Sequence, residues 1–404
     1  MALQQPPAQA TWASVPLTAR PLLKQLQQLR FGRLKVQFDN GALQSLVGTM
    51  DGPSAELVLH RPLSLVARLV ARGDIGFAEG YVAGDWDSPD LAATLSWGAL
   101  NEQALAQVTR GSRLSRALDR LRHVLRPNNR RGSRRNIARH YDLGNDFYAL
   151  WLDETMSYSS ALFDSVHHEL AAAQRRKYTR LLDSLEARPG QHILEIGCGW
   201  GGFAEQAARR GMRVTGVTLS QQQLRYARAR IKRLGLEDRV ELRLQDYRDV
   251  HETYDHIVSI EMFEAVGERY WPTYFETLHT RLKPGGRAAI QVITIGEDFF
   301  QAYRSQADFI QLYIFPGGML PTVGEFQELA RSVGLGVGSI ELFGPDYAET
   351  LHRWDNSFAA HGKQLAELGY DRRFQRLWHY YLAYCEAGFR TGRIDLMQTV
   401  LQRS

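Results

Sequence analysis

Four glycines follow a short apolar run, residues 192–196, and stand directly before residues 203–210, which have helical spacing. They are Gly197, Gly199, Gly201 and Gly202. A strand that turns through glycines into a helix lets a ligand press against bare backbone, because glycine has no Cβ. The helix N-terminus adds unpaired N–H groups and a partial positive field. The spacing therefore predicts a nucleotide-like ligand at this turn, although such turns also occur without any ligand.

A dinucleotide is the first alternative, since Gly197, Gly199 and Gly202 fit G-x-G-x-x-G. Glu195, however, ends the strand, where a carboxylate would face an anionic pyrophosphate. It suits a cationic or hydroxyl-bearing ligand better. The next strand ends in Thr218-Leu219-Ser220, without the acidic residue that holds an NAD ribose about 20 residues on. We therefore favour S-adenosylmethionine.

The composition is that of an ordinary globular protein, with 404 residues of which 44% are hydrophobic and 23% charged, enough for two or more domains. The two cysteines, Cys198 and Cys385, imply no disulfide framework and fit a reducing cytoplasm. We expect no secretory signal, no membrane-spanning segment and no metal site.

The positive charge is concentrated in one stretch. Residues 110–139 contain eleven arginines and one acid, Asp119, which gives a net charge of +10. Such a run attracts polyanions, either nucleic acid or an anionic lipid surface. A solvated linker is the alternative.

The chain order predicts a small α+β domain followed by a larger α/β domain. We expect residues 1–20 to be disordered, residues 21–135 to form an N-terminal domain ending in the basic connector, and residues 136–404 to form the catalytic domain. In the larger domain strands alternate with helices, which predicts a doubly wound, Rossmann-like sheet with ligands at the carboxyl ends of its strands. Strands are expected at 34–38, 55–60, 192–196, 213–219, 240–244, 256–260 and 287–294, and helices at 62–72, 169–185, 221–234, 270–282, 323–333 and within 347–397.

Eight segments carry a family resemblance. They resemble cyclopropane-fatty-acyl-phospholipid synthases and the related mycolic acid cyclopropane synthases, in family order over residues 138–397. Residues 21–135 are similar in position and size to the lipid-handling region of the phospholipid-acting members, which the mycolic acid enzymes lack. The segments are HYDLGNDFYALWLDETMSYSSALF, LEIGCGWGGFA, GVTLSQQQ, LQDYRD, SIEMFEAVGERYWPTYF, YIFPGGMLPT, FGPDYAETLHRW and YCEAGFRTGRIDLMQ.

The resemblance implies a class I S-adenosylmethionine-dependent methyltransferase domain. Thr218 and Gln223 can bond ribose hydroxyls, and Asp246 can accept from the adenine amine. Capping of local backbone is the alternative role for Thr218 and Asp246. The implied cofactor contacts are Tyr158, Ser159, Glu195, Gly197, Gly199, Gly201, Thr218, Leu219, Gln223, Gln245, Asp246 and Tyr247.

The implied reaction needs a base. An alkene attacks the sulfonium methyl, and the resulting carbocation, in an apolar tunnel beside aromatic faces, must lose a proton. The resemblance places a bound bicarbonate as that base, held by Glu264, Tyr347 and the backbone of Ser160, which stands at the family's cysteine position. Ile293 occupies the family's histidine position, so one donor to the anion is missing. Without a well-placed base the product would be a methyl-branched chain.

A further cysteine, Cys385 in YCEAGFR, matches a position often given as an active-site residue of the family. No step of this reaction needs a thiol nucleophile, and a buried structural cysteine is the alternative. The sequence does not decide whether Glu261 and Glu386 face the site.

The function expected is therefore S-adenosylmethionine-dependent cyclopropanation of an unsaturated phospholipid acyl chain, with a methyl-branched product as the alternative. Other readings are a methyltransferase for small molecules or nucleic acid, and a non-catalytic lipid- or nucleic-acid-binding protein. The expected partners are unsaturated phospholipid and, through residues 110–139, anionic lipid. No nucleic-acid partner is expected, and a homodimer stays open. We expect a cytoplasmic protein, peripheral at the inner membrane face.

Overall fold

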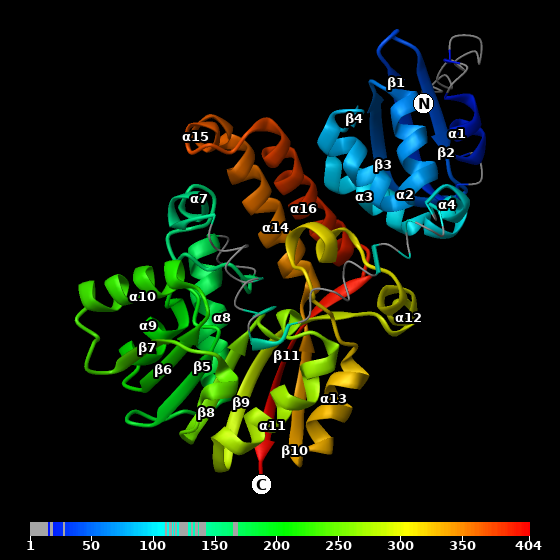
Figure 1. Ribbon diagram of the computed structural model, residues 1–404. Coiled ribbons are helices and arrows are strands. Elements are labelled where there is room, and N and C mark those ends of the chain that lie inside the picture. Colours follow the sequence, from blue (N-terminus) through cyan, green and yellow to red (C-terminus); the bar gives the residue numbers. More distant parts are fainter. Residues whose placement is uncertain are drawn as a thin grey trace, which may run out of the picture. The chain divides into compact units, whose positions relative to one another are not determined.

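The chain forms two units in the computed structural model. One unit comprises Met1–Asp119 with Tyr370–Thr391, and the other Arg120–Gly369 with Gly392–Ser404 (Figure 1). The structure describes residues 15–16, 19–26, 29–109, 143–164 and 169–404, and separate positions between 111 and 136. Most of the predicted disordered segment 1–20 lies outside these residues. So do all arginines of the basic run except Arg120 and Arg130.

The first unit contains a four-stranded sheet in the order β2-β1-β3-β4. Asn40 and Gly41 lie in the turn between β1 and β2, which pair antiparallel on either side of it. Gly41 has a φ of +80°, which a tight turn requires and glycine adopts readily. The strands are β1 (Phe31–Phe38), β2 (Leu43–Val47), β3 (Met50–Leu59) and β4 (Trp86–Asp87), and the helices are α1 (Arg20–Gln25), α2 (Pro62–Ala83), α3 (Leu91–Leu100), α4 (Glu102–Thr109) and α16 (Arg372–Arg390).

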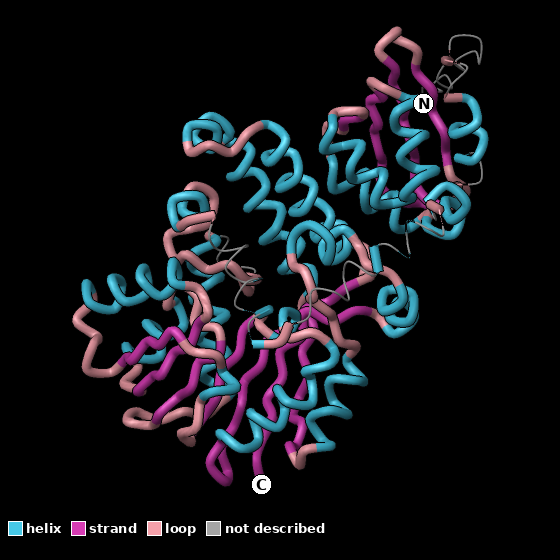
Figure 2. The backbone as a smooth tube through the Cα atoms, in the orientation of Figure 1, coloured by secondary structure: helices cyan, strands magenta, loops and turns pink. Residues whose placement is uncertain are grey.

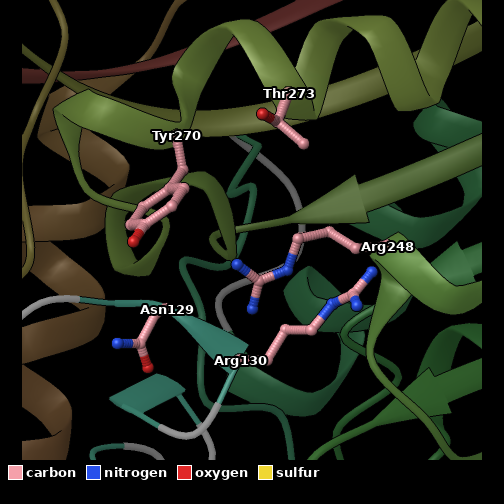
Figure 3. Close-up of a pocket in the computed structure, with 5 residues that line it drawn as sticks. All are labelled: Asn129, Arg130, Arg248, Tyr270 and Thr273. Carbon is pink, nitrogen blue, oxygen red and sulfur yellow. The ribbon is translucent and has the colours of Figure 1, made fainter.

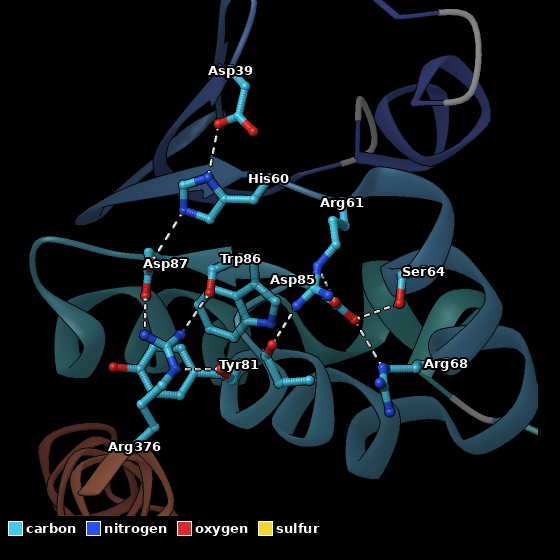
Figure 4. A network of polar contacts seen from close by, with 11 residues as sticks. Asp39, His60, Arg61, Ser64, Arg68, Tyr81, Asp85, Trp86, Asp87 and Arg376 are labelled. Carbon is cyan, nitrogen blue, oxygen red and sulfur yellow. Dashed lines mark hydrogen bonds and ion pairs between the residues drawn. The ribbon is translucent and has the colours of Figure 1, made fainter. Parts of the chain in front are cut away.

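A buried carboxylate joins β4 to α2 in this unit. Asp85 is fully buried, and its oxygens pair with Arg61 at 2.9 Å and Arg68 at 2.8 Å (Figure 4). Ser64 donates a further hydrogen bond at 2.7 Å. A buried charge is tolerated only when it is paired in this way, so the Asp85 contacts fix how the helix meets the sheet.

Helix α16 packs on α2 and α3, although it comes from the end of the chain. Arg376 explains the attachment, because it pairs with Asp87 at 2.6 Å and donates to the Tyr81 carbonyl at 2.7 Å (Figure 4). Asp87 also contacts His60. Residues 372–390 were expected in the second domain, and they group with the first unit instead. The predicted boundary near residue 135 stays a prediction.

The second unit is built on a seven-stranded sheet in the order β10-β11-β9-β8-β5-β6-β7. Strands β5 to β9 run parallel, which confirms the doubly wound α/β prediction. The strands (magenta in Figure 2) are β5 (His192–Ile196), β6 (Arg213–Thr218), β7 (Val240–Leu244), β8 (Tyr254–Ile260), β9 (Leu282–Ile295), β10 (Leu335–Leu342) and β11 (Ile394–Arg403).

Helices cover both faces of this sheet. Successive residues of a strand point to opposite faces, and Ile193 and Leu194 accordingly belong to two different apolar clusters. One cluster includes side chains of α8, α9 and α10, and the other those of α11 and α13. The helices are α7 (Asn145–Ala149), α8 (Leu170–Ser184), α9 (Gly202–Arg209), α10 (Gln221–Arg233), α11 (Trp271–Arg281), α12 (Glu297–Ser305), α13 (Val323–Ser332), α14 (Gly344–Ala360) and α15 (Gly362–Glu367).

Two strands of this seven-stranded sheet, β10 and β11, were not predicted. β11 pairs antiparallel with both β9 and β10, so the end of the chain inserts into the sheet where residues 347–397 had been expected to remain helical. In the described part of the chain every helix is too short or too polar to span a bilayer.

Candidate active site

The glycine turn has the backbone geometry that the sequence predicted. Gly197, Gly199 and Gly201 have φ values of +86°, +50° and +83°, in the left-handed region that disfavours other residues. Gly201 is also the N-cap of α9. A Cβ on Gly197 would approach the Met262 side chain to 3.1 Å. The turn therefore depends on glycine for conformation and for space.

Glu195 lies at the carboxyl end of β5 and is buried. Among the described residues its Oε2 atom has no hydrogen-bond partner. Burial raises the pKa of Glu195 well above its ordinary value. A buried acceptor without a partner is costly, so a ligand that brings an amine or hydroxyl donor fits this position. S-adenosylmethionine carries such donors, and the residues at this strand end fit it.

Thr218 is the last residue of β6, Leu219 follows it, and Gln223 lies in the first turn of α10. Thr218 donates its hydroxyl to Gln223 Oε1 at 2.9 Å and accepts from the Ser220 backbone at 3.1 Å. The local capping role of Thr218 is therefore present. Because Oε1 of Gln223 is occupied, its amide nitrogen is the group that can donate to a ribose oxygen.

Gln245, Asp246 and Tyr247 follow β7. The Asp246 carboxylate accepts from the Arg248 backbone at 3.0 Å and from its guanidinium at 2.8 and 2.6 Å. Gln245 donates to the Asp249 carbonyl at 2.7 Å. The capping role considered for Asp246 is thus present, and contact with adenine stays a prediction.

Glu261 is the centre of a hydrogen-bond cluster that the sequence did not assign. Its Oε1 accepts from the Ser160 backbone N–H at 2.9 Å and from Gln291 Nε2 at 2.7 Å. Its Oε2 accepts from the Tyr347 hydroxyl at 2.5 Å. The Glu261 backbone has a φ of +49°, a strained conformation for a residue other than glycine. Ser160 and Tyr347, both predicted to hold a bicarbonate, therefore meet on a carboxylate of the chain itself.

Glu264 lies close by in the 3₁₀ turn Phe263–Ala265. Its Oε1 accepts from the Ile293 backbone at 2.6 Å, while its Oε2 is buried without a partner among the described residues. Burial, reinforced by the negative charge of Glu261, raises the pKa of Glu264 to about 8. At pH 7 Glu264 is therefore mainly a neutral acid, a poor proton acceptor.

Aromatic rings surround Tyr158. Its ring centroid lies 5.3 Å from that of Tyr148 and 5.5 Å from those of Trp151 and Trp354. The Trp354 ring in turn lies 6.2 Å from that of Tyr347. Ring faces attract cations, so this cluster provides the surface that a carbocation requires.

Cys385 lies on α16, in the unit with residues 1–119, and is half-buried. Glu386 is its neighbour on the same helix. A catalytic role for Cys385 stays a prediction. Among the described residues no three His, Cys, Asp or Glu side chains form a group that would hold a metal ion.

A pocket of about 450 Å³ lies beside Arg248 (Figure 3). Its lining residues are Asn129, Arg130, Arg248, Tyr270 and Thr273. Arg130 is 65% exposed and pairs with Asp249 at 2.8 Å. An apolar channel that holds an acyl chain stays a prediction.

Known proteins resemble most of the chain. Residues 128–399 match the family model for mycolic acid cyclopropane synthetase. A tuberculostearic acid methyltransferase of Mycobacterium tuberculosis is 42% identical over 389 residues, 92% of this chain and 88% of that protein. The cyclopropane-fatty-acyl-phospholipid synthase of Escherichia coli is 33% identical over 345 residues, 83% of this chain and 85% of that protein.

A solved structure also matches. The mycolic acid cyclopropane synthase CmaA1, complexed with SAH and CTAB, has a TM-score of 0.63 and 31% identity, covering 67% of this chain and 98% of that one. The class I methyltransferase fold, the S-adenosylmethionine cofactor and the resemblance seen in the sequence are thus confirmed. The chain belongs to the mycolic acid cyclopropane synthetase family of S-adenosylmethionine-dependent methyltransferases.

Proposed function

We propose that this protein methylates the cis double bond of an unsaturated acyl chain in a phospholipid, with the Glu261 carboxylate as the proton acceptor. The observation that carries the proposal is the hydrogen-bond cluster on Glu261, which includes the Ser160 and Tyr347 donors expected to hold bicarbonate. The names of the two relatives, one a methyltransferase for tuberculostearic acid and one a synthase acting on fatty-acyl phospholipid, support the substrate class.

The residues divide the chemistry among them. Bound S-adenosylmethionine supplies an electrophilic methyl carbon. The alkene π electrons form the new C–C bond to this carbon, and the sulfur keeps the electron pair of the broken C–S bond. The aromatic cluster around Tyr158 stabilises the cation left on the acyl chain. Glu261 then removes a proton from the newly attached carbon. The C–H electron pair either closes a cyclopropane ring or, after a hydride shifts to the neighbouring carbon, forms a methylene C=C bond.

We favour the methylene-branched product, the precursor of a methyl-branched chain. Burial raises the pKa of Glu261, while the charge of Lys177 and the hydrogen bonds from Tyr347, Ser160 and Gln291 offset part of that rise. A hydride shift before proton removal converts the secondary cation into a more stable tertiary cation, which favours the branched product. The first relative, a tuberculostearic acid methyltransferase, supports this outcome. The cyclopropane product is the second candidate, supported by the Escherichia coli relative.

Product analysis tests the proposal. The protein is incubated with S-adenosylmethionine and vesicles of dioleoyl phospholipid, and the acyl chains are analysed. Both candidate products gain one CH2 unit in the mass spectrum, so proton NMR must separate them. Vinylic signals of an exocyclic methylene are expected, whereas ring signals upfield of the chain methyl groups would favour cyclopropanation. No mass gain with any unsaturated phospholipid would overturn the proposed function.

A lipid surface is the proposed partner, with the protein peripheral at the inner face of the cytoplasmic membrane. Arg130 belongs to the basic run and borders the pocket beside Arg248 (Figure 3). One basic residue near an anionic surface contributes about 1 kcal/mol, so Arg130→Ala is expected to weaken binding to phosphatidylglycerol vesicles about fivefold. Sedimentation with vesicles measures this, at several salt concentrations.

The control for Arg130 is Arg210→Ala, since Arg210 is also exposed and paired with an aspartate, Asp183. We expect it to bind like the unsubstituted protein, and neither substitution to matter on zwitterionic vesicles. An equal loss of vesicle binding in both variants would mean that net charge, and not the position of Arg130, causes the effect. Tighter binding to duplex DNA than to vesicles would favour the nucleic-acid alternative.

A further inference from the structure

Lys177, on α8, is a buried cation that the proposed reaction leaves unexplained. Its side chain is 0% exposed, which is rare for lysine. The ammonium donates to Ser159 Oγ at 2.5 Å and to Gln174 Oε1 at 2.6 Å, and it lies 4.4 Å from the Tyr178 ring centroid. Both hydrogen-bond acceptors of Lys177 are neutral oxygens, so neither neutralises the charge of the ammonium group.

The hydrogen bonds of Lys177 fix the segment that carries a donor to Glu261. Gln174 Nε2 donates to the Ser159 carbonyl at 2.8 Å, so α8 holds both the side chain and the backbone of Ser159. The next residue, Ser160, donates its backbone N–H to Glu261. A shift of Ser159 would therefore misalign that N–H.

The charge of Lys177 acts among several carboxylates. Glu261, Asp153 and Glu195 all favour its charged form, and Glu261 has the largest effect. Conversely, Lys177 is the main group that lowers the pKa of Glu261 against the burial that raises it. Of the other titratable groups near Glu261, Tyr347 also lowers its pKa by hydrogen bonding, and Glu264 is mainly neutral at pH 7.

We propose that Lys177 is a positioning residue that serves as the internal counter-ion of Glu261. Its buried charge keeps the Glu261 carboxylate ionised, and its hydrogen bond to Ser159 keeps the Ser160 N–H aligned with that carboxylate. The proposal rests on the proposed function, because it assigns Lys177 to the base of that reaction. Burial lowers the pKa of Lys177 itself to about 7, so the counter-ion is fully charged only at lower pH.

The test is Lys177→Met, which keeps the length of the side chain and removes its charge. Turnover is measured against pH at saturating cofactor and lipid. Because Glu261 then ionises only at higher pH, the acid limb of kcat is expected to move up by about one pH unit, with about tenfold lower kcat below that limb. Gln174→Leu is the control, since it loosens Ser159 without removing charge. We expect it to lower kcat without moving the acid limb.

A folded Lys177→Met variant with an unmoved acid limb would overturn the proposal, since a purely structural lysine predicts that result. Lys177→Gln serves if the methionine variant does not fold, because it keeps a hydrogen-bond donor without charge. A second measurement does not depend on lipid turnover. The ¹³C carboxyl titration of Glu261, identified by its loss in Glu261→Gln, should move to higher pH in Lys177→Met. It separates failure of this proposal from failure of the proposed function.

Discussion

Replacing Glu261 with glutamine is expected to lower kcat about 10²–10⁴-fold, the usual contribution of a general base. The amide keeps the size of the side chain but accepts no proton. In the unsubstituted protein the Ser160, Gln291 and Tyr347 donors all bind carboxylate oxygens of Glu261. In the variant, the amide NH2 group would face at least one of these donors and could not accept its hydrogen bond. Cofactor affinity, measured by calorimetry, should change little. A comparable loss of both would mean that Glu261 shapes the cofactor site instead.

Chemical rescue sharpens the Glu261 test. Glu261→Gly suits the left-handed backbone at this position and leaves the Ser160 N–H and the Tyr347 hydroxyl without their acceptor. Added bicarbonate, formate or acetate should therefore restore part of the lost activity, in proportion to its concentration. Glu261→Gln retains the bulk of the side chain and should not respond. Full activity of Glu261→Gly in carboxylate-free buffer would refute a catalytic role for this residue.

Glu264→Gln provides a matched control, because it converts the neighbouring carboxyl group to an amide in the same way. Since Glu264 is mainly protonated below about pH 8, glutamine resembles the form already present. We expect a loss of kcat below about tenfold at pH 7, much smaller than for Glu261→Gln. A larger loss of kcat in Glu264→Gln than in Glu261→Gln would assign the role of proton acceptor to Glu264.

The sequence predicted the parts of the site that depend on local patterns. The turn at Gly197–Gly201 follows from strand, glycine and helix succeeding one another, and Ser160 and Tyr347 from matching short motifs. The role of Glu261 was missed because Gln291, from β9, and Tyr347, from α14, reach it only after folding. One signal was available: Ile293 removes a donor for an external anion, while an extra carboxylate stands at Glu261.

The unpredicted elements share a cause. β11 is defined by pairing with β9, about 100 residues earlier in the chain, and Thr399 there faces Ile290. β10 contains Gly336 and Gly338, which weaken its strand pattern. The packing of α16 depends on Arg376, whose partner Asp87 lies far away in the sequence. Such long-range pairings leave little trace in local periodicity.

Replacing Asp246 with alanine is expected to destabilise the protein by about 3 kcal/mol. The side chains of Asp246 and Arg248 are 6% and 9% exposed, and removal of one partner leaves the other as an unpaired buried charge. For a unit of this size that loss lowers the melting temperature by roughly 6–12 °C, measured by calorimetry. Arg248→Met in the same chain removes the unpaired charge, so the double variant should recover most of the stability.

The double variant also separates the structural role of Asp246 from a cofactor role. Asp246 Oδ1 accepts two donors from Arg248 and Oδ2 accepts one, which leaves Oδ2 room for a further donor such as an adenine amine. If that contact exists, the stabilised double variant should still bind S-adenosylmethionine more weakly, by about 1.5–3 kcal/mol for a hydrogen bond to a charged group. Restored stability together with unchanged affinity would assign Asp246 to the Arg248 ion pair alone.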